Sequence, residues 1–168
     1  VGVERMNVQR LDKGTSGVLL VALTEAGCRS IGRQLREGSV RKEYLCLVCG
    51  HPSKTNGQVS AQLAVGGHKE QWRTTVSPKG KPAETKWKIE AKYKDKYQGA
   101  KYTLVRCWPI TGRTHQIRVH MQHIGHPLVG DVKYNRHNKV LRCDAEGEPE
   151  KTCHRLWLHC VRQTCADA

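Results

Sequence analysis

The hydrophobic pattern of the first forty residues predicts a buried strand followed by an amphipathic helix. Six consecutive apolar residues, 18–23, follow a glycine-rich stretch, and a short apolar run after a turn is typical of a buried strand. Thr24 and Glu25 then indicate a helix start, because a hydroxyl caps backbone N–H groups and an acid favours the first turn. Gly38 is expected to end this helix. Its apolar side would carry Cys28, Ile31 and Leu35, and its outer side Arg29, Arg33 and Arg36.

Alternating polar and apolar residues predict several strands between residues 40 and 108. Residues 40–49 form the first, with Tyr44, Cys46 and Val48 on one face and Leu45, Leu47 and Cys49 on the other. Short strands are predicted at 58–63 and 71–76. From Ala83 the alternation is regular, and the inward positions are Ala83, Thr85, Trp87 and Ile89. A lysine-rich hairpin loop at 95–99 then leads into a return strand at 102–108.

The last third of the chain predicts one helix, a loop, a polar insertion and a final strand. Thr111 or Thr114 is expected to cap the helix, whose apolar stripe is Ile117, Met121 and Ile124 and whose end is Gly125. Residues 127–135 read as loop, 136–153 as a polar surface insertion, and 154–162 as a strand with Leu156, Leu158 and Cys160 on one face. Few helices and many antiparallel strands predict an α+β fold, with a mixed, mainly antiparallel sheet. We expect residues 1–168 to form a single domain.

The charge of the chain favours a polyanionic partner. Twenty-nine Lys and Arg residues against fifteen Asp and Glu residues give a formal net charge of +14 over 168 residues. Nucleic acid is favoured over a membrane, because no stretch is long and apolar enough to span a bilayer. The basic residues are spread along the chain, so we expect them on the folded surface rather than in a tail.

The eight cysteines are expected to be buried free thiols rather than disulfides. Their spacing is irregular and no secretory signal is visible, which favours an intracellular, reducing compartment. Cys46 and Cys49 lie three positions apart in a predicted strand, so they point to opposite faces and are poorly placed to share a metal. A zinc site using Cys143, Cys153 and His154 is the alternative.

One acidic residue lies where a reactive group would be held rigidly. Asp12 falls in the stretch 8–17, in which two glycines are expected to make a tight turn before a strand. The alternative for an isolated Asp is a turn cap. A phosphate-binding loop is disfavoured at 14–17, because the Gly-Lys-Ser/Thr ending is missing and a strand rather than a helix follows.

Several motifs in one order resemble the RluA-type pseudouridine synthase family. The family signature His-Arg-Leu-Asp-x-x-Thr-Ser-Gly is similar to residues 9–17, and its Lys-x-Tyr segment is similar to residues 42–44. Its Gly-Arg-x-His-Gln-Ile-Arg-x-His signature resembles residues 112–120. Further matches are the segments 80–85, 125–131 and 158–160, so the resemblance runs from about residue 5 to residue 162.

The resemblance implies an isomerase that detaches uracil from N1 of an RNA uridine and rejoins it through C5, without cofactor or metal. Asp12 carries over as the catalytic aspartate, either as a nucleophile at the sugar or as the base that makes a glycal-like intermediate. Arg113 carries over as its cationic partner, since a planar guanidinium suits a carboxylate. Tyr44 would stack on the flipped base and assist proton transfer at C5, and Leu158 would wall the uracil. The remaining substrate-binding candidates are Arg10, Thr114, His115, Gln116 and Arg118.

The expected partner is structured RNA, either tRNA or rRNA. A base within a helix cannot reach a rigidly held aspartate, so the uridine must be flipped out, most easily from a loop or bulge. The active site is expected in a basic cleft whose Lys and Arg residues contact phosphates, and we expect a monomer with no obligate protein partner. A non-catalytic RNA-binding module with the same fold, and a zinc-stabilised nucleic-acid-binding domain, are the rival hypotheses.

Two features depart from the family pattern. Gln9 stands where the family usually has His; because Gln also donates and accepts hydrogen bonds, we expect altered tuning at most. Family catalytic domains usually have several tens of residues before the Arg-Leu-Asp signature, whereas residues 1–8 precede it here. We therefore expect a domain truncated at its N-terminus, with an unpaired sheet edge.

Overall fold

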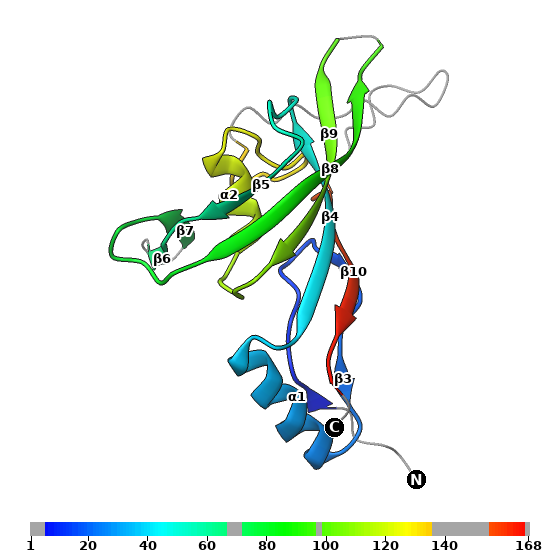
Figure 1. The fold of residues 1–168 in the computed structure, drawn as a ribbon, viewed down its shortest axis with the longest axis vertical. Coiled ribbons are helices and arrows are strands. Elements are labelled where there is room, and N and C mark those ends of the chain that lie inside the picture. The colour runs from blue at the N-terminus through cyan, green and yellow to red at the C-terminus, as the bar shows by residue number, and fades with distance from the viewer. Residues whose placement is uncertain (1–5, 67–71, 97–98, 136–154, 167–168) are drawn as a thin grey trace.

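The centre of the molecule is a six-stranded sheet with strand order β2-β10-β4-β9-β8-β5 (Figure 1). The computed structural model describes residues 6–66, 72–96, 99–135 and 155–166 of the chain. The strands of the sheet are β2 (Ser16–Gly17), β10 (Leu158–Thr164), β4 (Arg41–Cys49), β9 (Lys101–Pro109), β8 (Glu84–Lys94) and β5 (Asn56–Ser60). β2 and β10 are parallel and the other neighbours are antiparallel. The α+β fold with a mixed, mainly antiparallel sheet is confirmed.

Two ribbons and two helices complete the described structure. One ribbon pairs β1 (Met6–Asn7) with β3 (Val21–Ala22), and the other pairs β6 (Leu63–Gly66) with β7 (Arg73–Val76). Figure 1 shows α1 (Glu25–Glu37) beside the β1–β3 ribbon, at the opposite end of the molecule from the β8–β9 hairpin. α2 (Gln116–His123) lies alongside the sheet. Within the described residues, no helix has the length and hydrophobicity that crossing a membrane requires.

Helix α1 forms as its sequence predicts. The Thr24 side chain accepts a hydrogen bond from the backbone N–H of Gly27, at 3.0 Å, and so satisfies one of the free donors of the first turn. Gly38 ends the helix in the left-handed conformation, with φ 75°. The arginine side is exposed and the apolar side is half-buried, as the spacing of the residues requires.

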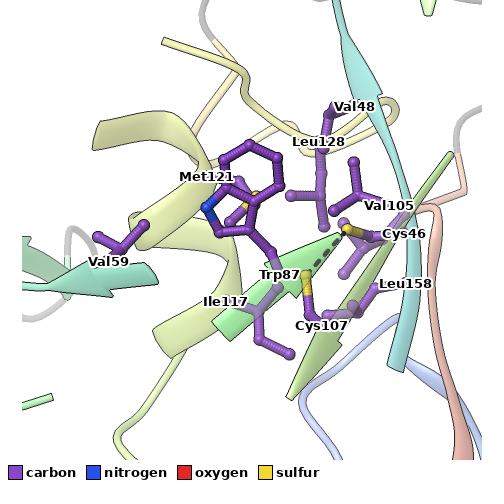
Figure 2. Close-up of a cluster of buried hydrophobic side chains, with 11 residues drawn as sticks. Cys46, Val48, Val59, Trp87, Val105, Cys107, Ile117, Met121, Leu128 and Leu158 are labelled. Atoms are coloured by element: carbon purple, nitrogen blue, oxygen red, sulfur yellow. Dashed lines mark hydrogen bonds between the residues drawn. The ribbon is translucent and has the colours of Figure 1, made fainter. Parts of the chain in front are cut away.

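Strand β4 divides the hydrophobic core into two parts, because its alternate residues face opposite sides of the sheet. Cys46 and Val48 belong to a cluster in which Trp87 packs against Ile117 and Met121 of α2 (Figure 2). Leu47 belongs to a separate cluster with Tyr102 and Val129, against which Cys49 and Leu104 pack. Both predicted faces of β4 are confirmed, and so is the inward set Ala83, Thr85, Trp87 and Ile89, which is buried or half-buried.

The cysteines of the described residues are free thiols, as predicted. Cys46 and Cys107 lie closest, with their sulfurs 3.8 Å apart inside the main cluster (Figure 2). Cys46 and Cys49 do face opposite sides of the sheet, and no cluster of metal-ligating residues occurs in the part of the chain that is described. Cys143, Cys153 and His154 lie outside the described residues, as does the polar insertion predicted at 136–153.

The prediction of a continuous buried strand at residues 18–23 is wrong. Only Val21–Ala22 forms a strand there, and Val18, Leu19 and Leu23 are 41%, 42% and 63% exposed. The segment leaves the main sheet after β2 and crosses to the β1–β3 ribbon, where α1 packs on β3. An apolar run is buried on both faces only when other elements cover both.

The prediction that a threonine caps the second helix is also wrong. The N-cap of α2 is His115, which has no side-chain capping bond. Thr111 instead accepts a hydrogen bond from the Glu84 N–H at 3.0 Å and donates one to Gln116 Oε1 at 2.6 Å. Its hydroxyl therefore ties the end of β9 to β8 and to the helix start. Smaller shifts affect three strands: Asn56–Ser60 replaces 58–63, Arg73–Val76 replaces 71–76 and Leu158–Thr164 replaces 154–162.

Candidate active site

The structure brings all nine of the predicted site residues to one cavity of about 470 Å³. They come from four separate parts of the chain: the loop before β2, strand β4, the segment between β9 and α2, and strand β10. The nine are Arg10, Asp12, Tyr44, Arg113, Thr114, His115, Gln116, Arg118 and Leu158. Lys13 and Lys42 add to the positive lining, so that among the described lining residues Asp12 is the one acid beside five basic residues. The expected basic cleft is present.

A tight turn holds Asp12 at the cavity wall. The backbone N–H of Thr15 donates to the Asp12 carbonyl at 2.9 Å, and Gly14 has φ 87° at the third position of the turn. This is the geometry of a type II turn, which favours glycine at that position because φ is positive. On the near side of the turn, Gln9 Nε2 donates to Gln163 Oε1 of β10 at 2.7 Å. Asp12 is thus held between two anchored segments.

Strand β2 fixes the far side of the same turn. Ser16 and Gly17 pair with His159 and Cys160 of β10, and Ser16 Oγ lies 2.8 Å from His159 Nδ1. Leu158, one residue before this pairing, is 5% exposed and belongs to the main core cluster while also lining the cavity. The apolar floor of the cavity is therefore part of the rigid core.

Tyr44 lies between two cysteines in the register of the sheet. It pairs with Cys107 on β9 and with Cys160 on β10, and it packs against the main core cluster. Burial raises the pKa of its phenol, and Cys160 and then the charge of Asp12 add to that rise. The ring is therefore a neutral phenol at physiological pH, with Asp12 close enough to influence it.

Lys42 lines the cavity in addition to the nine predicted site residues. It lies two positions before Tyr44 on β4, so both side chains occur on one face of the strand, and that spacing was the available signal. A β-carbon on Gly112 would lie 3.5 Å from Lys42 Nζ, which puts the ammonium beside the loop that carries Arg113. Burial lowers the pKa of Lys42, and the Cys160 thiol partly opposes that shift.

The Gln116 side chain connects the loop 111–113 to the start of strand β8 at the cavity wall. Its Oε1 accepts hydrogen bonds from Thr111 Oγ1 and from the Arg113 N–H, at 2.6 and 3.0 Å. Its Nε2 donates to the Glu84 carbonyl and to Thr85 Oγ1, at 2.9 and 3.0 Å. A primary amide has two donors and two acceptor lone pairs, so this side chain is fully used within the protein.

His115 adopts a backbone conformation that is rare for a residue other than glycine, with φ 55°. Its Nδ1 lies 2.8 Å from Tyr134 Oη, which also accepts a hydrogen bond from the Thr74 N–H at 2.9 Å. Because that oxygen is already an acceptor, its proton is available to His115 Nδ1. Burial and then the charge of Arg118 lower the pKa of His115, against a smaller opposing effect of Asp12. His115 is accordingly neutral at physiological pH.

Arg118 lines the cavity through a side chain that is already paired. Its Nε and Nη2 donate to the two carboxylate oxygens of Asp131, at 2.7 and 2.8 Å. Its guanidinium also lies over the Tyr134 ring, 4.9 Å from the centroid. Burial alone would lower the pKa of Arg118, but Asp131 and the charge of Asp12 raise it. A network that the sequence pattern did not predict therefore supports the cavity wall at His115 and Arg118. It links Asp131, Arg118, Tyr134 and His115.

Arg113 contacts the protein backbone in this structure. Its Nε donates to the Pro82 carbonyl at 3.0 Å, and its residue is exposed. Ion pairs within 4 Å among the described residues include Arg118–Asp131 and Arg106–Glu90, and none joins Asp12 to Arg113. Asp12 and Arg113 therefore line the same cavity without an ion pair between them.

The comparisons with known proteins assign this chain to a family. Residues 4–123 match the family model described as RNA pseudouridylate synthase. The chain therefore belongs to the RNA pseudouridylate synthase family. Ribosomal large subunit pseudouridine synthase C of Escherichia coli (strain K12) is 48% identical to it over 158 residues, which cover 90% of this chain and 45% of that protein. The protein of the same description from Yersinia pestis is 41% identical over 153 residues, covering 90% and 44%.

A solved structure is similar along almost the whole chain. Human RNA Pseudouridylate Synthase Domain Containing 1 superposes with a TM-score of 0.76 at 28% identity, covering 98% of this chain and 69% of that one. Human RNA Pseudouridylate Synthase Domain Containing 4 gives a TM-score of 0.71 at 22% identity, which is likeness of fold. The chain spans less than half the length of the curated bacterial relatives that it matches.

Proposed function

We propose that this chain isomerises uridine to pseudouridine in RNA, with Asp12 as the reacting carboxylate. The observation that carries the proposal is the convergence of Asp12, Tyr44, Arg113 and Leu158 on one basic cavity from four parts of the chain. The N1–C1′ bond of the uridine breaks, the uracil turns, and a C5–C1′ bond forms. The C5 proton is lost and N1 gains a proton, so the reaction needs no net reactant besides the nucleotide.

Asp12 acts in one of two ways within this scheme. As a nucleophile it attacks C1′ and holds the sugar covalently, and as a base it removes a sugar proton and leaves a glycal-like intermediate. Both routes need an ionised carboxylate. The type II turn supports either role, because it fixes the backbone that carries the carboxylate before the substrate arrives.

The other cavity residues hold and turn the base. Tyr44 stacks on the flipped uracil, and its neutral phenol can donate a hydrogen bond to the base but cannot itself take up the C5 proton. Leu158 supplies the apolar wall behind the ring. Arg113 exchanges its bond to the Pro82 carbonyl for one to Asp12 when the nucleotide enters, and Arg10 contacts the phosphate backbone. Lys42 joins this set, while Gln116 and Arg118 position the wall through their internal bonds.

Uridines in large-subunit ribosomal RNA are the proposed substrates. Relatives described as ribosomal large subunit pseudouridine synthase C share up to 48% identity across 90% of this chain. The target uridine lies in a loop or bulge, because unstacking is least costly there. Mapping pseudouridine at single-nucleotide resolution, in cells with and without the protein, tests this assignment; loss of a site in tRNA alone would contradict it.

Replacing Asp12 with Asn tests the reaction itself. Asn keeps the size and shape of the side chain but removes the negative charge, so product formation should fall below detection. Pseudouridine is measured by carbodiimide labelling and primer extension on RNA incubated with the purified chain. Asp95→Asn is the matched control, because Asp95 is also a turn residue but lies between β8 and β9 and does not line the cavity. Unchanged product with Asp12→Asn would refute Asp12 as the reacting group, and absence of product from the wild-type chain would favour the rival, a non-catalytic RNA-binding module.

A further inference from the structure

A second hollow, of about 800 Å³, lies between helix α1 and the segment that leads to Asp12. We call it the α1 groove. Asn7 and Val8 form one wall. The helix forms the other wall with Ala26, Cys28, Arg29, Ser30, Gly32, Arg33 and Arg36. Figure 1 shows α1 beside the ribbon that contains Asn7.

The α1 groove is lined by small side chains and by three arginines. Arg29 pairs with Glu25 at 3.1 Å, but both side chains are more than 70% exposed, so the pair is weak. Arg33 and Arg36 are exposed, and neither has an acidic partner within 4 Å among the described residues. The guanidinium of Arg36 reaches back along the helix, since a β-carbon on Gly32 would lie 3.5 Å from its Nη1. Within the described part of the chain, the groove thus presents two arginines that have no acidic partner.

A short segment of the chain connects the α1 groove to the cavity. Residues 7–8 line the groove and residues 10–13 line the cavity. An extended chain rises at most about 3.6 Å per residue, so Asn7 and Asp12 are within about 18 Å of each other. An RNA strand with one nucleotide in the cavity therefore has its flanking backbone within reach of the groove.

We propose that the α1 groove binds the phosphate backbone that flanks the target uridine, through Arg33 and Arg36. The inference rests on the proposed function, since it takes RNA as the substrate of the neighbouring cavity. Planar guanidinium groups bind phosphate with two parallel hydrogen bonds, and the small residues between them let a backbone approach closely. A protein partner is disfavoured, because none of the described lining residues is an aromatic anchor.

The double variant Arg33→Ala/Arg36→Ala tests the proposal by RNA binding. The probes are a uridine trinucleotide and the same trinucleotide extended by single-stranded RNA on both sides. Loss of two phosphate contacts should reduce the slope of log K against log salt concentration by about 1.4 to 1.8 for the extended RNA. The trinucleotide should lose less of its slope, because it offers the groove only the phosphates next to the uridine.

Lys92→Ala/Lys94→Ala is the matched control. It removes the same two positive charges from exposed positions of β8, at the opposite end of the molecule from α1. The extended RNA should bind this control with the wild-type slope. An unchanged slope for the arginine variant, or an equal loss in both double variants, would overturn the proposal. Binding is read without turnover, so a failure of Asp12→Asn to abolish product would refute the proposed reaction and leave this result standing.

Discussion

Gly17 and Cys160 approach so closely that a β-carbon on Gly17 would come 2.0 Å from the Cys160 carbonyl oxygen. The contact lies where β2 pairs in parallel with β10, and the Val18 N–H donates to the same carbonyl at 2.9 Å. Gly17 also has φ 116°, a conformation that side chains disfavour. The turn that carries Asp12 is therefore held to the strand that carries Leu158 by a backbone contact that only glycine allows.

Gly17→Ala should separate β2 from β10 and displace Asp12. The unfavourable φ alone costs about 1–3 kcal/mol, and the clash with Cys160 adds to it. We expect the free energy of unfolding in urea to fall by at least that amount and pseudouridine formation to be lost. Gly66→Ala is the control, because no described residue lies within 4 Å of its β-carbon position. Equal stability of the two variants would contradict the close approach.

Asp131→Asn should destabilise the protein strongly. The change leaves the Arg118 guanidinium buried without its anionic partner, and breaking a buried ion pair on one side typically costs about 3–5 kcal/mol. Chemical denaturation measures the loss. Glu25→Gln breaks an ion pair at the exposed surface of α1, and it should leave the unfolding midpoint nearly unchanged. A similar small effect for both variants would refute the supporting role of Arg118 and Asp131.

Lys42→Met should stabilise the folded chain at neutral pH. Burial lowers the pKa of Lys42 in the folded state, so the unfolded chain binds its proton more tightly. The wild-type lysine therefore costs stability below its folded pKa, and this cost disappears as the pH rises toward the ordinary lysine pKa. The difference in unfolding free energy between variant and wild type should shrink at alkaline pH. Lys92→Met, at an exposed site, should show no such trend.

Arg113→Lys should reduce the rate far more than the RNA affinity. Lysine keeps the charge but loses the planar fork that suits a carboxylate, and RNA contacts many other basic residues. Single-turnover rates and equilibrium binding, measured on the same RNA, separate the two effects. Equal loss of both quantities would mean that Arg113 serves mainly as a phosphate contact.

Local rules predicted the elements whose sequence pattern matches their environment. The Thr24 cap, the left-handed Gly38 and the spacing of the arginines were sufficient for α1. The strict alternation in 40–49 and from Ala83 onward gave the faces of β4 and β8 correctly, because both strands pack on covered faces. Residues 18–23 do not form the predicted buried strand, because their apolar pattern does not reveal that the chain leaves the sheet there.

By itself, the sequence determined the fold class, the basic surface and the identity of the reactive candidates, because period, charge and motif are local properties of the chain. Only the tertiary structure decided how these candidates meet. It directs the side chains of Gln116 and Arg118 to hydrogen-bond partners within the protein. It also gives His115 its left-handed conformation and brings Lys42 into the cavity. The physical reason is that these roles depend on partners far along the chain, such as Asp131 and Glu84, which only sheet pairing and burial bring within hydrogen-bond distance.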